Sequence, residues 1–165
     1  NKSNPVKNLT TAQLREIFMG EIKNWSEVGG PDEKIMVLSR DSSSGTHVFF
    51  KEHILRKGNE KGPEEYSKTA LFLPSNEALK QQIENSKGAI AYIGMGYMGN
   101  SVKDLTVNGV EANLVNVKSK KYPIARGVYW YTDKKLDGIT KDLVSYMMSA
   151  KGQAIVKKEG FVPVK

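Results

Sequence analysis

The sequence predicts an α/β protein in which a sheet is flanked by helices. Short apolar runs of strand length alternate with stretches whose apolar residues recur at helical spacing. Residues 35–38 form one such run, residues 48–55 follow with helical spacing, and residues 89–93 are continuously apolar, as in a strand covered on both faces. A chain of 165 residues, 39% hydrophobic and 26% charged, can bury a core within one domain. Strands that alternate with helices are typical of the α/β class.

The first helix and the loop after it have clear signals at their ends. Thr10 and Gln13 have the spacing of a capping box, and Gly20 is placed to end the helix. Residues 21–32 are predicted to be a loop. Trp25 is expected to anchor that loop by packing rather than to bind a ligand.

Two more strand and helix units are predicted in the middle of the chain. A brief strand at residues 71–73 precedes a helix that Ser75 caps. Pro63 is expected to begin a short helix, because proline is favoured at the first helical position. The strand at residues 89–93 completes this part of the chain.

The last third of the sequence predicts a hairpin, a strand and terminal helices. Residues 105–112 alternate around an Asn-Gly pair, which is a strong signal for a hairpin turn. Residues 127–132 are rich in aromatics and are predicted to be a strand. Helical spacing begins near residue 139, and Gly160 is expected to end it.

The polar loop between the run at 35–38 and the helix at 48–55 has the composition of an anion site. It consists of Arg40, Asp41, Ser42, Ser43, Ser44, Gly45 and Thr46. The free N–H groups and the positive dipole end of a helix N-terminus favour an anion. Hydroxyls donate hydrogen bonds, arginine binds two oxygens in a fork, and glycine allows close approach. The loop therefore predicts a site for a tetrahedral oxyanion.

Each loop residue has an expected role in that site. Arg40 is expected to neutralise and orient the anion, while Ser44 and Thr46 donate hydroxyl bonds. The amides of Gly45 and Thr46 would complete the cradle. Ser42 and Ser43 are additional candidate ligands, and Asp41 is expected to steady Arg40.

Simpler interpretations of the same residues stay open at this point. Ser44 is explained equally by a helix N-cap, and Arg40 by a solvated surface charge. His47 is expected at the surface rather than on the anion. The other three arginines, Arg15, Arg56 and Arg126, are expected to matter little for binding.

The pattern Arg-x-x-x-Ser-Gly-Thr after a strand resembles the anion loop of the phosphate-binding proteins that serve phosphate ABC importers. Further segments agree with that family in order and spacing, and together they cover nearly the whole chain. They include residues 4–6, 17–20, 24–25, 88–94, 107–110, 122–126 and 152–156.

This resemblance implies one lobe of a type II periplasmic-binding-protein fold that binds inorganic phosphate without chemistry, as the solute receptor of an ABC importer. Residues 1–125 would form the anion-binding lobe, and residues 126–165 a crossover strand and C-terminal helices. A membrane permease is the implied partner. The implied location is extracytoplasmic, either periplasmic or anchored on the outer face of the membrane, although no signal peptide is visible in the sequence.

The chain departs from the family pattern in two ways. Many relatives carry an aspartate two residues after the arginine, where this chain has Ser42, with Asp41 one place earlier. Family members also close two lobes on the anion, and the loop of the first lobe has no counterpart here. We therefore expect phosphate binding in the high micromolar range or weaker, and self-association through apolar surface that another lobe would cover.

Other classes of function have less support in the sequence. The chain has two histidines and no cysteine, and none of its residues has the spacing of a metal site or of a G-x-S-x-G nucleophile elbow, so we expect no enzyme, metal or cofactor. A net charge of +7 fits nucleic acid, yet the lysines are scattered, so we expect no nucleic-acid partner. The alternatives are another oxyanion, sulfate or molybdate, and, from another class, a basic module that binds nucleic acid or a protein partner.

Overall fold

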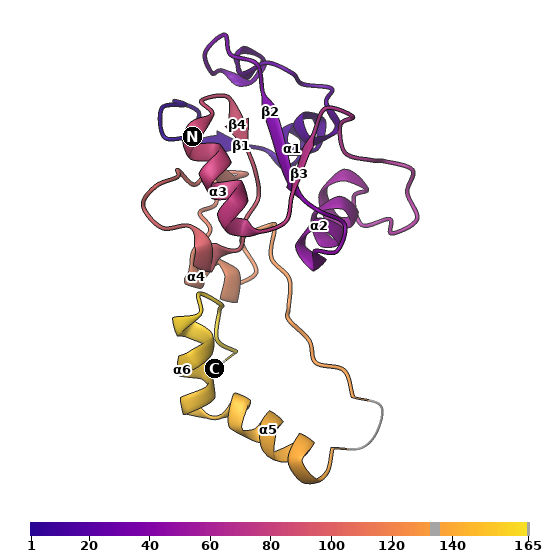
Figure 1. Ribbon diagram of the computed structural model, residues 1–165, viewed down its shortest axis with the longest axis vertical. Coiled ribbons are helices and arrows are strands. Elements are labelled where there is room, and N and C mark those ends of the chain that lie inside the picture. Colours follow the sequence, from indigo (N-terminus) through magenta and orange to yellow (C-terminus); the bar gives the residue numbers. More distant parts are fainter. Residues whose placement is uncertain (133–135, 165) are drawn as a thin grey trace.

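The computed structural model describes residues 1–132 and 136–164, and it confirms the predicted α/β class (Figure 1). The strands are β1 (Asn8–Leu9), β2 (Met36–Arg40), β3 (Leu71–Leu73), β4 (Ala89–Ile90) and β5 (Thr106–Val107). The helices are α1 (Thr11–Met19), α2 (Gly45–Phe50), α3 (Asn76–Asn85), α4 (Leu114–Lys118), α5 (Gly138–Met148) and α6 (Ala150–Lys158). Shorter helical turns are η1 (Trp25–Val28), η2 (Lys51–Leu55) and η3 (Met95–Tyr97).

The central sheet has the order β3-β2-β4, with every pair parallel. Its two faces are covered by different helices. Leu38 packs with Leu79 and Ile83 of α3, whereas Val37 belongs to a second cluster with residues of α1 and η2. The alternation of adjacent side chains along β2 therefore joins two cores through one strand.

A second sheet pairs β1 with β5 in parallel, so residues 106–107 have a partner that the sequence did not indicate. The expected turn is present, because Asn108 and Gly109 both have positive φ, at 52° and 77°. The expected hairpin is reduced to a single bridge between Val107 and Val110.

Most of the predicted end signals are confirmed. Thr10 and Gln13 form both halves of a capping box, and Gly20 ends α1 in the left-handed conformation. Ser75 caps α3. Trp25 is buried and its indole N–H donates to the carbonyl of Gly88 at 2.9 Å, so it is the packing anchor that was expected.

Three elements differ from the prediction. The helix predicted for residues 48–55 begins at Gly45 and changes into a turn of π-helix at Lys51. No helix begins at Pro63, and the strand predicted over 89–93 pairs only through residue 90. The strand predicted over residues 127–132 is absent, because those residues are assigned no regular structure.

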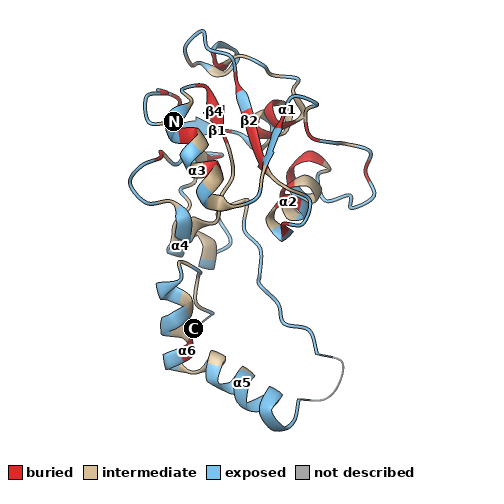
Figure 2. Ribbon diagram, in the orientation of Figure 1, coloured by how far each residue is buried: buried red, intermediate tan, exposed pale blue. Residues whose placement is uncertain are grey.

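The C-terminal segment leaves the body of the protein as an arm, which carries α5 and α6 and returns beneath α4 (Figure 1). Buried residues are concentrated in the body, while most of the arm is exposed (Figure 2). The arm returns to the body at two glycines, where a Cβ on Gly96 would lie 2.6 Å from the Cα of Gly160. Within the described residues, no helix has the length and apolar character needed to cross a bilayer.

Candidate anion-binding site

The loop of residues 41–44 leaves the carboxyl end of β2 and enters α2. After β2, the chain adds β3 on one side of that strand and then β4 on the other. The strand order therefore reverses at β2. In open α/β sheets, ligands bind at the carboxyl ends of strands beside such a reversal. The sheet order therefore places the predicted loop where a ligand site is expected.

Asp41 organises the loop from within. Its Oδ1 accepts hydrogen bonds from the amide of Ser43, at 2.9 Å, and from the hydroxyl of the same residue. Both bonds lower the pKa of Asp41, and the bond from the Ser43 hydroxyl has the larger effect. The positive charge of Arg40 lowers the pKa further, by a smaller amount. Asp41 thus bonds to Ser43 rather than to the Arg40 guanidinium that it was expected to steady, and Ser43 has its hydroxyl proton engaged.

Ser44 is the N-cap of α2. Its Oγ accepts from the amides of Thr46 and His47, at 3.2 and 3.4 Å, and the side chain is buried. The capping interpretation is therefore confirmed, but it leaves the hydroxyl proton of Ser44 free to donate. Because the Thr46 amide donates to the Ser44 Oγ, only the Thr46 hydroxyl remains available to bind an anion.

Several donors of the loop have no acceptor within residues 1–132 and 136–164. They are the amides of Ser42 and Gly45 and the hydroxyls of Ser42, Ser44 and Thr46. A cluster of unpaired donors at the start of a helix is suited to an anion rich in acceptor oxygens.

Arg40 continues this set of donors. Its Nη2 donates to the carbonyl of Pro74 at 2.8 Å, which holds the guanidinium at the loop that leads into α3. Its Nε is buried and has no hydrogen-bond partner in the described chain. An unpaired buried donor on a charged group is costly unless a ligand completes it. Arg40 is therefore partly buried, and its Nε is shielded from solvent.

Behind the loop lies a buried hydrogen-bond network that sequence reasoning missed. The Oγ of Ser39 lies 2.6 Å from the Tyr92 hydroxyl, which lies 3.1 Å from the Tyr66 hydroxyl. The Tyr66 hydroxyl donates to the carbonyl of His47 at 3.0 Å. Burial raises the pKa of both tyrosines, and for Tyr66 the neighbouring phenol adds to the effect. Both phenols therefore stay protonated and fix the frame of the loop.

His47 belongs to this network. Its Nδ1 lies 2.8 Å from the carbonyl oxygen of Arg40, which can only accept, so Nδ1 carries the proton. The ring is buried and packs 4.7 Å from the ring of Tyr66. The expectation of a surface histidine is wrong: His47 ties the first turn of α2 back to the end of β2.

Arg126 also lies at the loop, although it was expected to matter little for binding. Its Nη2 is 3.0 Å from the position that a Cβ on Gly45 would occupy. Its Cζ lies 5.8 Å from the centre of the Phe49 ring, within range of a cation–π interaction. Arg126, Phe49 and Thr46 line the same cleft of about 1040 Å³.

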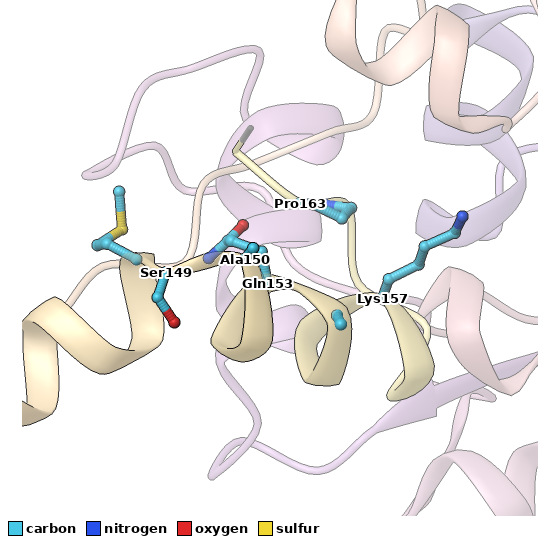
Figure 3. A pocket seen from close by; sticks show the side chains of 7 residues that line it. Ser149, Ala150, Gln153, Lys157 and Pro163 are labelled. Atoms are coloured by element: carbon cyan, nitrogen blue, oxygen red, sulfur yellow. The ribbon is translucent and has the colours of Figure 1, made fainter.

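A second, smaller pocket lies on the arm, between the end of α5 and the start of α6 (Figure 3). The side chains of Ser149 and Gln153 in this pocket are already engaged. Ser149 caps α6 through Gly152, and Gln153 bonds to the carbonyl of Met147 and the amide of Val164. Lys157 points away from Ser149 (Figure 3). The described residues also contain no group of three or more His, Cys, Asp or Glu that could hold a metal ion.

Comparisons with known proteins agree on one family. The family model for the PBP superfamily domain matches residues 1–151. The phosphate-binding protein PstS of Borreliella burgdorferi is 34% identical over 166 residues, which cover 97% of this chain and 60% of that protein. PstS of Bacillus subtilis is 35% identical over 161 residues, 96% of this chain and 51% of that protein. The chain therefore spans between half and two thirds of the length of these curated relatives.

Solved structures give the same result at the level of the fold. A putative phosphate ABC transporter substrate-binding protein from Clostridium perfringens, with bound phosphate, matches with a TM-score of 0.84 and 34% identity, covering 100% of this chain and 66% of that one. An ABC-type phosphate transport receptor from Vibrio cholerae matches with a TM-score of 0.83 and 30% identity, over 98% of this chain and 66% of that one. The chain belongs to the PBP superfamily, and its parallel sheet flanked by helices is the type II periplasmic-binding-protein fold of these phosphate-binding relatives.

Proposed function

We propose that this chain binds inorganic phosphate, without chemistry, as part of the solute receptor of a phosphate ABC importer. The observation that carries the proposal is the buried, unpaired Nε of Arg40, beside a helix start whose hydroxyls and amides also lack acceptors. The relatives reported above are phosphate-binding proteins by name, which supports phosphate as the anion.

The roles follow from which donors remain available. Arg40 contributes charge and the Nε–H bond, Ser44 and Thr46 contribute hydroxyl protons, and Gly45 contributes its amide. Ser42, which is exposed, supplies a further amide and hydroxyl. Ser43 and Asp41 act on each other and shape the loop, so we assign them a supporting role.

The same geometry argues against catalysis. A serine nucleophile needs a base within hydrogen-bond reach. The Nδ1 of His47 carries its proton toward the Arg40 carbonyl, and the buried ring packs on Tyr66. We therefore propose a binding protein that works with a membrane permease on the extracytoplasmic side of the membrane, as expected for the family.

We further propose that residues 1–125 form the anion-binding unit and that the arm from residue 126 onward packs against another body. The arm exposes Tyr129, Tyr131 and Ile139, at 71%, 90% and 87% of their surface. Large apolar side chains exposed to this degree indicate a surface that another body covers. In solutions of this chain alone, a second copy is the available partner.

Titration calorimetry of the chain with phosphate, sulfate and a short DNA duplex tests the function. Saturable heat with phosphate alone supports the proposal. Equal affinity for sulfate would assign a less selective oxyanion site. Binding to the duplex that falls steeply with salt, without phosphate binding, would overturn the proposal in favour of a polyanion-binding module.

A further inference from the structure

We propose that Arg126 is a second cation of the anion site and contacts the bound phosphate beside Gly45. The inference rests on the proposed function. It changes the expectation that Arg126 matters little, and it extends the anion-binding unit from residue 125 to residue 126. It starts from the 3.0 Å separation between the Arg126 Nη2 and the Cβ position of Gly45.

Gly45 has no conformational need to be glycine. It is not among the residues with positive φ, and its place at the first position of α2 suits any side chain. What a side chain would meet there is the Arg126 guanidinium, whose three nearest atoms lie at 3.0, 3.6 and 3.7 Å. A side chain at residue 45 would therefore require the Arg126 guanidinium to shift by a few tenths of an ångström.

Arg126 is held in this position by contacts on both sides. The carbonyl of Pro123 lies 2.8 Å from the Nε2 of His53, which joins the segment before Arg126 to η2. His53 stacks on Phe49, with ring centres 5.1 Å apart. The guanidinium of Arg126 lies over the same Phe49 ring in a cation–π contact. A planar guanidinium on an aromatic ring keeps its edge free for an oxyanion.

Within the described residues, neither arginine at the loop forms an ion pair with a carboxylate. In the part of the chain that the structure describes, the ion pairs are Arg15 with Glu64 and Glu65 with both Lys51 and Arg56. Arg40 and Arg126 thus leave two positive charges beside the loop, with Asp41 the acid of the loop itself. Two guanidinium groups match an anion that carries two negative charges better than one that carries a single charge.

The first test compares Arg126→Ala with Arg126→Lys by phosphate calorimetry. Loss of one charge-assisted contact at an exposed position predicts a Kd about tenfold higher for Arg126→Ala. Arg126→Lys should recover part of the loss, because it keeps the charge but not the fork. Lys68→Ala removes an equal charge from an exposed loop and should leave the Kd unchanged. Circular dichroism should show all three variants folded.

The second test is a double-mutant cycle with Gly45→Ala. The added methyl group displaces the Arg126 guanidinium, so the substitution should weaken phosphate binding in the wild-type background and have little effect in the Arg126→Ala background. Equal weakening in both backgrounds would overturn the inference, because Gly45 would then serve the anion directly.

These outcomes separate the two proposals. An unchanged Kd in Arg126→Ala, with binding lost in Arg40→Ala, would overturn the role of Arg126 and leave phosphate binding intact. Absence of phosphate binding by the unaltered chain at millimolar phosphate would overturn the proposed function, and the role of Arg126 with it.

Discussion

The Nδ1 of His47 lies 2.8 Å from the carbonyl oxygen of Arg40, so the first turn of α2 is bonded to the last residue of β2. This bond spans the whole loop between them. It fixes where the amides at the start of α2 point relative to the Arg40 side chain. The anion site is therefore held by a buried contact and not by the loop residues alone.

Replacing His47 with alanine should lower both stability and phosphate affinity. The buried ring loses its bond to Arg40 and its packing on Tyr66, which predicts a loss of about 1–3 kcal/mol in the free energy of unfolding. Urea denaturation and phosphate titration measure the two effects. If affinity is unchanged in folded His47→Ala protein, the bond does not position the site.

Tyr92→Phe should be more damaging than the loss of one hydroxyl implies. The Tyr92 hydroxyl contacts Ser39 at 2.6 Å and Tyr66 at 3.1 Å, and it lies 3.4 Å from the Arg40 amide. Removing it takes one hydrogen bond each from the hydroxyls of Ser39 and Tyr66, at a cost of about 1–3 kcal/mol. Thermal denaturation checks this, and Val115→Ala at an exposed site is the control. A melting temperature equal to that of the control would show that water replaces the hydroxyl.

Stability should fall at alkaline pH because of the buried phenols. Burial raises the pKa of Tyr66 in the folded state above the ordinary value near 10. The unfolded chain therefore releases this proton first, so the contribution is fully present below about pH 10 and is lost as pH rises beyond it. Urea midpoints measured between neutral pH and pH 11 should show the decline, with a shallower slope in Tyr66→Phe. An identical slope in the variant would contradict the assignment.

Gly96→Ala should loosen the arm. The new methyl group would meet the backbone of Gly160, which is itself in the left-handed conformation, so neither chain can yield easily. We expect faster proteolysis between residues 126 and 138 with the body intact. Val115→Ala, at an exposed position of α4, is the control for an unrelated surface substitution. Equal cleavage rates for both variants would mean that this contact does not hold the arm.

The exposed arm predicts self-association. Sedimentation velocity should show a concentration-dependent dimer, and Tyr131→Ser with Ile139→Ser should shift it toward monomer because both side chains are largely exposed and apolar. A strict monomer at all concentrations would contradict this prediction.

Local signals explain why much of the fold was predictable. The capping box at Thr10, the αL glycine at Gly20 and the apolar run that became β2 each act within a few residues of sequence. The pairing of β5 with β1, almost 100 residues earlier, has no such signal. The aromatic run at 127–132 was misread because its composition favours a strand, while pairing depends on a partner that the composition does not reveal.

The candidate site divides in the same way. The loop from Arg40 to Thr46 was visible because its residue types and order are local. Arg126 and Tyr92 reach it from 80 and 46 residues beyond Thr46, through chain folding alone. His47 was placed on the surface because a polar residue in a first helical turn is usually solvated. Its burial depends on Tyr66 and Ser39, which the sequence does not connect to it.

The most direct test of this account is phosphate calorimetry on Arg40→Ala, with Lys68→Ala as the charge-matched control. Loss of the Arg40 charge and of its charge-assisted Nε–H bond predicts a Kd about ten- to a hundredfold higher for Arg40→Ala. The control should bind as the unaltered chain does, and both variants should remain folded. Unchanged phosphate affinity in folded Arg40→Ala protein would contradict the assignment of this loop as the phosphate site.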